Sequence, residues 1–261
     1  MVTRTINGTS SNDTLVDPDT QSNPEDTTIN GLGGADTISL GWGNDIAYGG
    51  LQNDLIIGGD GRSTIYGNEG NDIILPSFLG VSNVYGGDGD DLIDMEGDED
   101  TLPPRTDYLR GEAGNDTIYL TAYNGGDYAY GGEGNDTLIS QSGVGGNHFL
   151  YGGPGNDIIY SNGGDDISVG VGTDLIIYDK KTYGTNPVPM IVRTFENNID
   201  KFEILDAPGL ILRSTQSGTS ALVQLQRNGA WDTLAEFVFF SASNLSLTIA
   251  GTSPNLRYIF S

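Results

Sequence analysis

The chain repeats a short glycine-rich segment that ends in an acidic residue and runs into aliphatic ones. The stretch "YGGPGNDIIY" at residues 151–160 is echoed by "YGGEGNDTLI" from Tyr130. Acidic residues at the same place recur nine residues apart, as at Asp36, Asp45 and Asp54. Sustained repetition at a fixed short period is typical of a solenoid, in which each unit packs only on its neighbours. This repeat therefore restricts the fold more than any other feature of the sequence.

The acidic position continues along most of the chain, interrupted by insertions of one to three residues and a few deletions. Ser63, Ser82 and His148 take the acidic place at three turns, and Asp100 stands in a degenerate turn. Glycine is permissive, and Asn and Asp tolerate positive φ, so these segments are predicted to be turns. The predicted turn carboxylates are Asp36, Asp45, Asp54, Asp72, Asp91, Asp107, Asp116, Asp127, Asp136, Asp157, Asp166 and Asp174.

A second column of residues, two places after each turn residue, is usually aliphatic. It includes Ile38, Ile56 and Ile118, with Ser168 as a polar exception, and Ile6, Leu15 and Ile29 extend it towards the N-terminus. Each three-residue segment around such a side chain predicts a short strand with one residue facing inward. Two turns and two strands close one coil, and coils stack as parallel strands. The predicted fold is an all-β, right-handed parallel β-roll of about eight coils.

The charge of the chain points to a cation as its partner. The 36 acidic residues outnumber the 11 basic ones, giving a net charge of −25, which would repel nucleic acid. Stacking places the acidic residue of each turn near that of the next coil, and a cation would relieve the repulsion. Calcium accepts six to eight carboxylate and carbonyl oxygens in flexible geometry, whereas magnesium needs a stricter octahedron. Zinc prefers Cys and His, but the chain has no Cys and one His.

The repeat, written G-G-x-G-x-D-x-U-x with U a large aliphatic residue, resembles that of the RTX (repeats-in-toxin) haemolysin-type calcium-binding family. The resemblance covers roughly residues 5–178. It implies several calcium ions, each shared between the Asp and glycine carbonyls of one turn and the turn one coil away. The glycines it implies are Gly114, Gly132, Gly134, Gly153 and Gly155. By counting turns, we expect one column to hold Asp116, Asp136, Asp157 and Asp174, and the opposite column to hold Asp36, Asp54, Asp72 and Asp91.

Departures from the repeat predict weaker calcium sites. We expect calcium to bind weakly or not at all at Ser63, Ser82 and His148. His148 is interpreted as a packed or solvated turn residue and not as a catalytic or metal-binding one. The alternative of a metal-free glycine-rich β-helix leaves the column of acidic residues unexplained.

The composition changes near Tyr183, where the glycine turns end and Pro187 and Pro189 follow. We therefore divide the chain into a β-roll at residues 1–180 and a β-rich cap at residues 181–261. "FENNIDKFEIL" is similar to the segment that follows the repeats in many RTX proteins. A solenoid needs such a cap, because its last coil would otherwise expose unpaired strand edges. The predicted cap strands are 190–195, 202–205, 210–213, 221–226, 234–240, 245–249 and 257–260, with a hairpin turn at 227–230.

The likeness to RTX proteins implies export. Such proteins commonly leave Gram-negative cells through a type I channel, directed by an uncleaved C-terminal signal. The start of the chain has no apolar segment typical of a secretory signal, and no run of 18 apolar residues predicts a membrane span. We expect a secreted, extracellular or cell-surface protein that folds when it meets calcium.

The outward residues of the predicted strands differ between the two sheets. If turns simply alternate, one sheet presents an apolar row that includes Leu55, Ile73, Tyr128 and Phe149, and the other presents Thr, Asn and a row of tyrosines. The apolar face is either covered by the chain's own C-terminal part or forms an interface with another copy or partner. The tyrosines are interpreted as stacking between coils, with carbohydrate binding as an alternative and ice binding a weaker one.

No motif of a known catalytic mechanism is present in the sequence. HExxH, GxSxG and P-loop patterns are absent, and the repeat accounts for the abundant carboxylates as metal ligands. We therefore expect a non-enzymatic, calcium-dependent structural or binding protein of the cell surface or extracellular matrix that self-associates. The alternatives are a polysaccharide-binding module and a standalone accessory part of an RTX enzyme or toxin.

Overall fold

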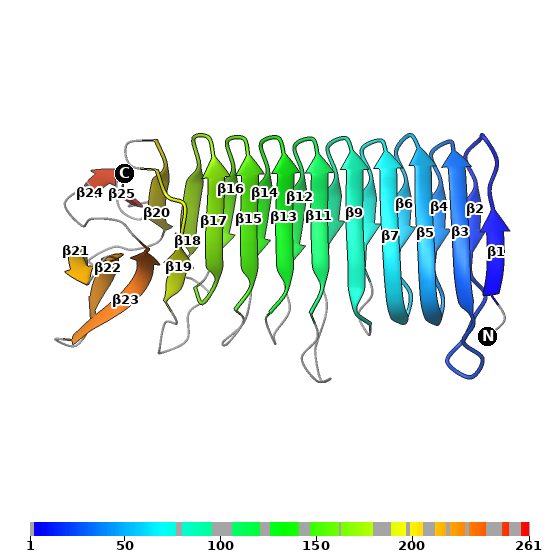
Figure 1. The fold of residues 1–261 in the computed structure, drawn as a ribbon, viewed down its shortest axis with the longest axis horizontal. Helices are drawn as coiled ribbons and strands as arrows, with labels where there is room; N and C mark the ends of the chain where they lie inside the picture. Colours follow the sequence, from blue (N-terminus) through cyan, green and yellow to red (C-terminus); the bar gives the residue numbers. More distant parts are fainter. Residues whose placement is uncertain are drawn as a thin grey trace.

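The computed structural model is a long two-sheet solenoid followed by a smaller β-rich end (Figure 1). The structure describes residues 3–76, 80–95, 106–120, 126–140, 147–161, 163–179, 189–196, 199–205, 212–217, 220–227, 230–238, 247–250 and 257–260. The strands stand side by side in one row, with the two chain ends at opposite ends of it. No helix among the described residues is long and apolar enough to cross a membrane.

Successive strands of the solenoid alternate between a 13-stranded and a 12-stranded sheet, so each coil contributes one strand to each sheet. Paired strands within the solenoid are parallel. The solenoid strands of the first sheet are β1 (Thr3–Asn7), β3 (Asp26–Gly33), β5 (Gly43–Leu51), β7 (Gly61–Glu69), β9 (Ser82–Asp88), β11 (Tyr108–Ala113), β13 (Tyr128–Glu133), β15 (Phe149–Pro154) and β17 (Asp166–Val171). Those of the second are β2 (Thr14–Val16), β4 (Thr37–Ser39), β6 (Leu55–Ile57), β8 (Ile73–Leu75), β10 (Leu92–Asp94), β12 (Thr117–Leu120), β14 (Thr137–Ser140), β16 (Ile158–Ser161) and β18 (Leu175–Asp179). The predicted all-β parallel solenoid is confirmed.

One aliphatic side chain from each short strand fills the space between the sheets. Ile38, Ile56, Ile74 and Ile118 of the second sheet are fully buried. The same registered column continues through the first sheet, where Leu109 pairs with Ala129. Burying this unbroken column is the main apolar contribution to the stability of the fold, since the residues on either side of it face outward.

The two edges of the solenoid differ in regularity. Eight turns, from the one joining β3 to β4 through the one joining β17 to β18, each have three residues between strands; we call this the uniform edge. Turns from the second sheet back to the first have between three and thirteen residues; we call this the variable edge. All the insertions of the solenoid after β3 therefore lie on one edge, and the other edge stacks identical turns on every coil.

This distribution corrects the predicted phase of the repeat. Strand β10 pairs with β12, and β9 pairs with β11, so residues 95–107 belong to one turn of the variable edge. Asp100 lies outside the described residues, and the direct pairing of β10 with β12 means that the two strands belong to successive coils. Counting Asp100 as a turn placed Asp116 and Asp91 on opposite columns, and that assignment was wrong. The long insertion loops out because the inward column must keep its register.

The corrected phase also reassigns the outer faces. The first sheet carries two stacked aromatic columns, Tyr108–Tyr128–Phe149 and Tyr48–Tyr66–Tyr85, with ring centroids 4.5–5.0 Å apart. The second column continues through Arg110, whose guanidinium lies 4.9 Å from the Tyr85 ring, to Tyr130 and Tyr151. The predicted apolar face mixed residues of both sheets. The outer face of the second sheet instead carries Leu55, Ile57, Ile73, Leu75, Leu92, Tyr119, Ile139, Ile158 and Tyr160.

The C-terminal strands extend both sheets at the end of the solenoid. In the first sheet, β19 (Met190–Val192) is followed by β23 (Ala230–Phe237), β22 (Ser220–Arg227) and β21 (Leu212–Ser217). In the second, β20 (Lys201–Leu205) is followed by β25 (Arg257–Phe260) and β24 (Leu247–Ala250). The predicted hairpin is confirmed by the pairing of Arg227 with Ala230. These strands continue the sheets lengthwise, so the described part of the cap does not lie over the apolar outer face.

Candidate calcium-binding ladder

A ladder of carboxylates runs along the uniform edge. The Oδ1 atom of each turn Asp accepts a hydrogen bond from the backbone N–H of the turn Asp one coil earlier, as from Asp116 to Asp136 at 2.8 Å. The bonds link ten acidic residues in one unbroken file: Asp13, Asp36, Asp54, Asp72, Asp91, Asp116, Asp136, Asp157, Asp174 and Asp200. Eight of the twelve predicted turn carboxylates thus lie on a single column.

The second oxygen of eight of these carboxylates has no partner among the described residues. In the eight residues from Asp36 to Asp174 the Oδ2 atom is buried and accepts no hydrogen bond from the described protein. A buried charged oxygen without a partner is costly, because it has lost its hydration and gained nothing in return. A cation bound beside each of these oxygens, one on each coil, would offset this cost.

Burial raises the pKa of the ladder carboxylates from Asp54 to Asp200 above their ordinary range. It raises the pKa of Asp91 to about 8 and the pKa values of Asp54, Asp116 and Asp157 to about 7 each. Neighbouring carboxylates add to this, as Asp136 does for Asp116, while the backbone hydrogen bond opposes it. Without a cation, the folded ladder holds protons that an unfolded chain would release. The ionised form of the ladder is therefore less favourable in the folded chain than in the unfolded chain.

In seven of the eight uniform turns, the first glycine leaves space for two converging oxygens, and Val169 takes its place in the last turn. A Cβ built on Gly131 would stand 2.6 Å from the carbonyl oxygen of Gly152 and closer still to Asp136 Oδ2. The same pair of oxygens, one from the turn's own Asp and one from the next coil, lies beside Gly49, Gly67, Gly86 and Gly111. A carboxylate and a carbonyl aimed at one point are the hard oxygen ligands that calcium prefers.

The glycines that were predicted as calcium ligands shape the turns. Gly114, Gly132, Gly134, Gly153 and Gly155 all have positive φ, between 117° and 148°, which side chains rarely adopt. At each of them a Cβ would collide with a carbonyl group of the preceding coil, such as that of Gly134 for Gly155. These glycines therefore allow successive turns to stack closely and bring their carbonyl groups together.

The variable edge carries a shorter and interrupted file. Asp45, Asp107 and Asp127 lie there, and the Oδ1 atom of Asp107 accepts the backbone N–H of Ser82. Ser63, Ser82 and His148 occupy buried turn positions on the same edge. His148 Nδ1 lies 3.3 Å from Asp127 Oδ2, so the imidazole faces the carboxylate column as a packed residue. All three departures from the repeat fall on this edge, where the loops also vary in length.

One predicted ligand lies elsewhere than expected. Asp166 is on the outer face, where it forms an ion pair with Arg193. Asp165 takes the turn position instead, accepting the backbone N–H of His148 at 3.0 Å, and Ile167 is the inward residue where Ser168 was expected. The prediction counted nine residues from Asp157 to the next turn carboxylate, but the actual spacing, to Asp165, is eight residues. The aliphatic residue two places after Asp165 was the signal that would have found it.

Two further acidic sites escaped the repeat pattern. Asp200, within the segment similar to the RTX end cap, is the last member of the ladder, and Phe202 two places later is buried between the sheets. At the other end, Asp17, Asp19 and Glu25 surround Arg4 in a turn without the glycine motif. The latter cluster had no periodic signal in the sequence.

The donor set fits calcium better than other metals. Among the described residues, no group of three or more His, Asp or Glu side chains is placed to hold a metal ion by itself, so each ladder site offers a carboxylate together with backbone oxygens. Calcium readily uses carbonyl oxygens, and the stacked turns bring them from two coils. When bound, it would supply the positive charge that the free Oδ2 atoms lack. A two-sheet solenoid with this edge defines a calcium-binding parallel β-roll.

Comparison with protein families agrees with that class. The model of the RTX calcium-binding nonapeptide repeat matches residues 23–56, 48–76, 81–102, 105–138, 121–144 and 142–172, which together make up more than half of the chain. The chain therefore belongs to the RTX haemolysin-type calcium-binding repeat family. A search of curated proteins found no match.

A solved structure with a similar fold is the X-ray crystal structure of a hyperactive, Ca²⁺-dependent, β-helical antifreeze protein from an Antarctic bacterium. It is 22% identical in sequence, with a TM-score of 0.45. The alignment covers 74% of this chain and 68% of that one.

Proposed function

We propose that this RTX protein is a secreted scaffold of the cell surface or extracellular matrix that folds when it binds calcium. One observation carries the proposal: the uniform edge holds eight buried carboxylates whose Oδ2 atoms have no hydrogen-bond partner in the part of the chain that the structure describes. Calcium ions between coils would neutralise this file and join each coil to the next. The proposal assigns the chain no catalysis, and turnover of a substrate by the pure protein would overturn that part.

Calcium binding to such a ladder is coupled to folding. An unfolded chain has no preformed site, so the binding free energy of each ion contributes to the stability of the coiled state. Weak extracellular calcium sites work at about 10⁻⁴–10⁻³ M, far above the free concentration in cytosol. RTX repeat proteins are typically secreted, and we infer that this chain stays unfolded until export brings it into calcium.

The outer face of the second sheet supports self-association. Ile73 is 43% exposed there, with partly buried Leu75 in the same strand and partly buried Leu55 and Ile57 in the neighbouring strand. A contiguous apolar area of this kind is typical of an interaction surface. The described cap strands extend the sheet lengthwise and leave the face uncovered. A second copy of the chain, with the same flat apolar face, is the occupant we propose.

The stacked tyrosines argue against the alternative of carbohydrate binding through the first sheet. The rings of Tyr48, Tyr66 and Tyr85 lie within about ten degrees of parallel, with centroids 4.8 and 5.0 Å apart. Their faces are therefore covered by each other, and mainly ring edges point away from the sheet. Sugar rings stack on aromatic faces, so this column serves the contact between coils.

A calcium titration of the full chain tests the proposal. Far-UV circular dichroism and size-exclusion chromatography with light scattering would be recorded in EGTA and then at rising calcium. We expect a cooperative gain of β structure and a smaller hydrodynamic radius, followed by association into larger species. A chain that is equally compact and β-rich in EGTA would contradict the calcium ladder; a calcium-folded strict monomer would contradict self-association alone.

A further inference from the structure

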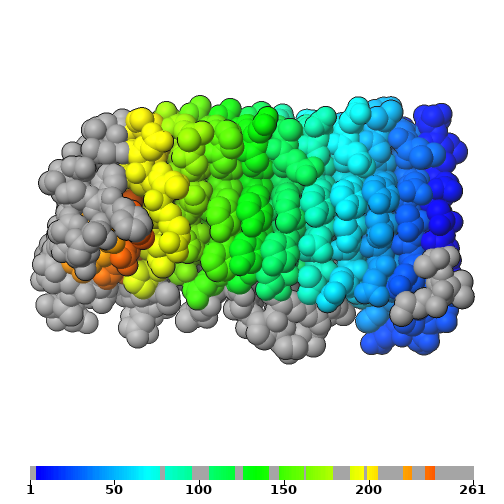
Figure 2. All heavy atoms as spheres, in the orientation of Figure 1, coloured from blue at the N-terminus to red at the C-terminus, as the bar shows by residue number. Residues whose placement is uncertain are grey.

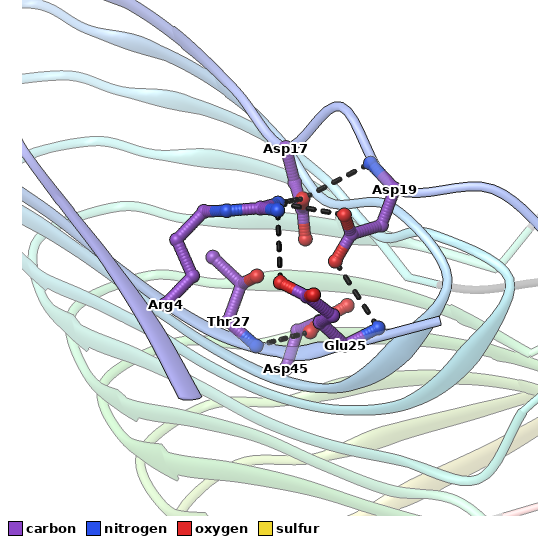
Figure 3. Close-up of polar contacts among 6 residues, drawn as sticks. All are labelled: Arg4, Asp17, Asp19, Glu25, Thr27 and Asp45. Atoms are coloured by element: carbon purple, nitrogen blue, oxygen red, sulfur yellow. Dashed lines mark hydrogen bonds and ion pairs between the residues drawn. The ribbon is translucent and has the colours of Figure 1, made fainter. Parts of the chain in front are cut away.

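An acidic pocket closes the N-terminal end of the variable edge, outside the repeats. Its side chains come from the turn between β2 and β3 and from Asp45 in the next coil. Figure 3 shows Asp17, Asp19, Glu25 and Asp45 directed towards one small region, with Arg4 entering from β1. Four carboxylates and one guanidinium leave this region with a formal charge of −3. A single internal cation is therefore present but does not balance the charge.

Arg4 holds one side of the pocket. Its Nη1 atom lies 2.9 Å from Asp17 Oδ1 and 2.7 Å from Asp19 Oδ1, and its Nη2 atom lies 2.9 Å from Glu25 Oε2. Asp17 Oδ1 also accepts the backbone N–H of Asp19, and Asp19 Oδ2 accepts that of Glu25. These bonds fix the orientation of the Asp17 carboxylate, so its second oxygen is held in one direction.

Three buried oxygen atoms in the pocket have no hydrogen-bond partner in the described protein: Asp17 Oδ2, Asp45 Oδ2 and Thr27 Oγ1. The side chain of Asp17 is completely buried, and Asp45 and Thr27 are each 1% exposed. Asp45 uses its other oxygen to accept the Thr27 backbone N–H at 2.8 Å. Two charged oxygens and a hydroxyl are thus removed from water, without a partner, on adjoining coils.

Backbone carbonyls complete the set of oxygens. A Cβ built on Gly41 would lie 3.2 and 3.3 Å from the carbonyl oxygens of Asp19 and Asp17. The carbonyl oxygen of Glu25 would lie closer still to a Cβ built on Gly43, which is in the same strand as Asp45. Glycine at both places keeps this space open, as it does beside the ladder on the other edge. The ligands are hard oxygens, which favour calcium over softer metals.

We propose that this pocket is a further calcium site, built from Asp17, Asp45 and Thr27 with nearby carbonyls, in which Arg4 positions Asp17. It rests on the calcium-dependent folding proposed above. Thr27 stands where a repeat would place its Asp, and Asp17 supplies the missing carboxylate from the preceding turn. One calcium ion would change the formal charge of the region from −3 to −1 and would join the first coils through shared ligands.

Terbium luminescence tests the site, because Trp42 lies on the turn between Gly41 and Gly43. Terbium takes the oxygen ligands of calcium, and a tryptophan sensitises its emission only over a short distance. The calcium-folded full chain would be titrated with terbium under selective tryptophan excitation. We expect sensitised emission that excess calcium displaces, and we expect Trp42→Phe to reduce it to the level from the remaining tryptophan.

Asp17→Asn distinguishes the site from the ladder. We expect it to lower terbium emission to the Trp42→Phe level, while calcium-dependent circular dichroism of the chain is retained. Asp26→Asn is the matched control: it removes the same charge from the same coil, but Asp26 is only partly buried and its Oδ1 atom is bonded to Asn44. Full emission from Asp17→Asn, or equal loss from both variants, would overturn the proposal. Loss of calcium-dependent folding in the unmodified chain would instead contradict the ladder.

Discussion

The backbone N–H of Asp91 donates to Asp116 Oδ1 at 2.8 Å, although 25 residues separate the two. One oxygen of the Asp116 carboxylate thereby fastens two coils, and the other, Oδ2, is buried and has no hydrogen-bond partner among the described residues. The two oxygens of each carboxylate differ in the same way from Asp36 to Asp174. Each of these residues therefore joins two coils through Oδ1 and offers Oδ2 to a cation, and the following predictions depend on that combination.

Removing one ladder charge should weaken calcium binding with little change in shape. In Asp136→Asn the amide oxygen can still accept the Asp116 N–H, but the free carboxylate oxygen is lost. A hydrogen bond or ligand contact to a charged group contributes about 1.5–3 kcal/mol. We expect the calcium concentration at half-folding, followed by circular dichroism, to rise by about tenfold or more.

The control for this variant is Glu133→Gln in the same turn, which removes an equal charge from an exposed residue. We expect a shift of less than about twofold there, because exposed charges interact weakly. Equal shifts for Glu133→Gln and Asp136→Asn would mean that only net charge matters.

The calcium-free chain should be more compact in acid than at neutral pH. Asp54, Asp91, Asp116 and Asp157 have folded pKa values raised to between about 7 and about 8, against 3.8 in an unfolded chain. The folded state then binds more protons, so the stability is fully present below about pH 4 and is lost as pH rises through 7–8. Sizing in EGTA at several pH values measures this; expansion on acidification across that window would refute it.

Calcium affinity should change with pH in the opposite sense. Calcium requires the ionised carboxylate, and protons compete for the same Oδ2 atoms. We expect the calcium midpoint to rise as pH falls from about 8 to about 6, the range of the raised pKa values. Isothermal titration in buffers of different ionisation enthalpy would detect the released protons. A midpoint independent of pH would show that the ladder carboxylates are not the ligands.

A single methyl group at the first glycine of a uniform turn should disrupt the ladder. Gly131→Ala would place Cβ against Asp136 Oδ2 and the Gly152 carbonyl, and backbone atoms cannot move aside cheaply. We expect a loss of about 3 kcal/mol in calcium-bound stability, measured by denaturant unfolding. Gly33→Ala is the control, since the nearest atom there is 3.8 Å away. Equal stability of both variants would exclude the glycine cradle.

Self-association should depend on the outer face of the second sheet. Ile73→Lys introduces a charge at its centre, and we expect it to shift the calcium-bound protein towards monomer in light scattering. Leu51→Lys is the matched control, because Leu51 is 49% exposed at the end of β5, away from that face. If Ile73→Lys leaves the size distribution unchanged, another surface mediates association.

The sequence alone determined the local chemistry of this protein. Gly-rich turns of nine-residue period, the Asp that ends each turn and the aliphatic residue two places later follow from local φ preference and side-chain alternation, as at Asp157 and Ile159. Those patterns sufficed to predict the parallel solenoid and its carboxylates. Most cap strands were also found, because alternating apolar residues mark them.

Only the tertiary structure decided which turns stack. Whether Asp91 adjoins Asp107 or Asp116 depends on which edge of the solenoid contains the insertion after β10. The strand register between coils decides this. The same non-local pairing selects Asp165 over Asp166 and gathers Arg4 with Asp17, Asp19 and Glu25. Residues far apart in sequence come together because the coils stack so as to bury one column of side chains. A local sequence pattern does not contain that information.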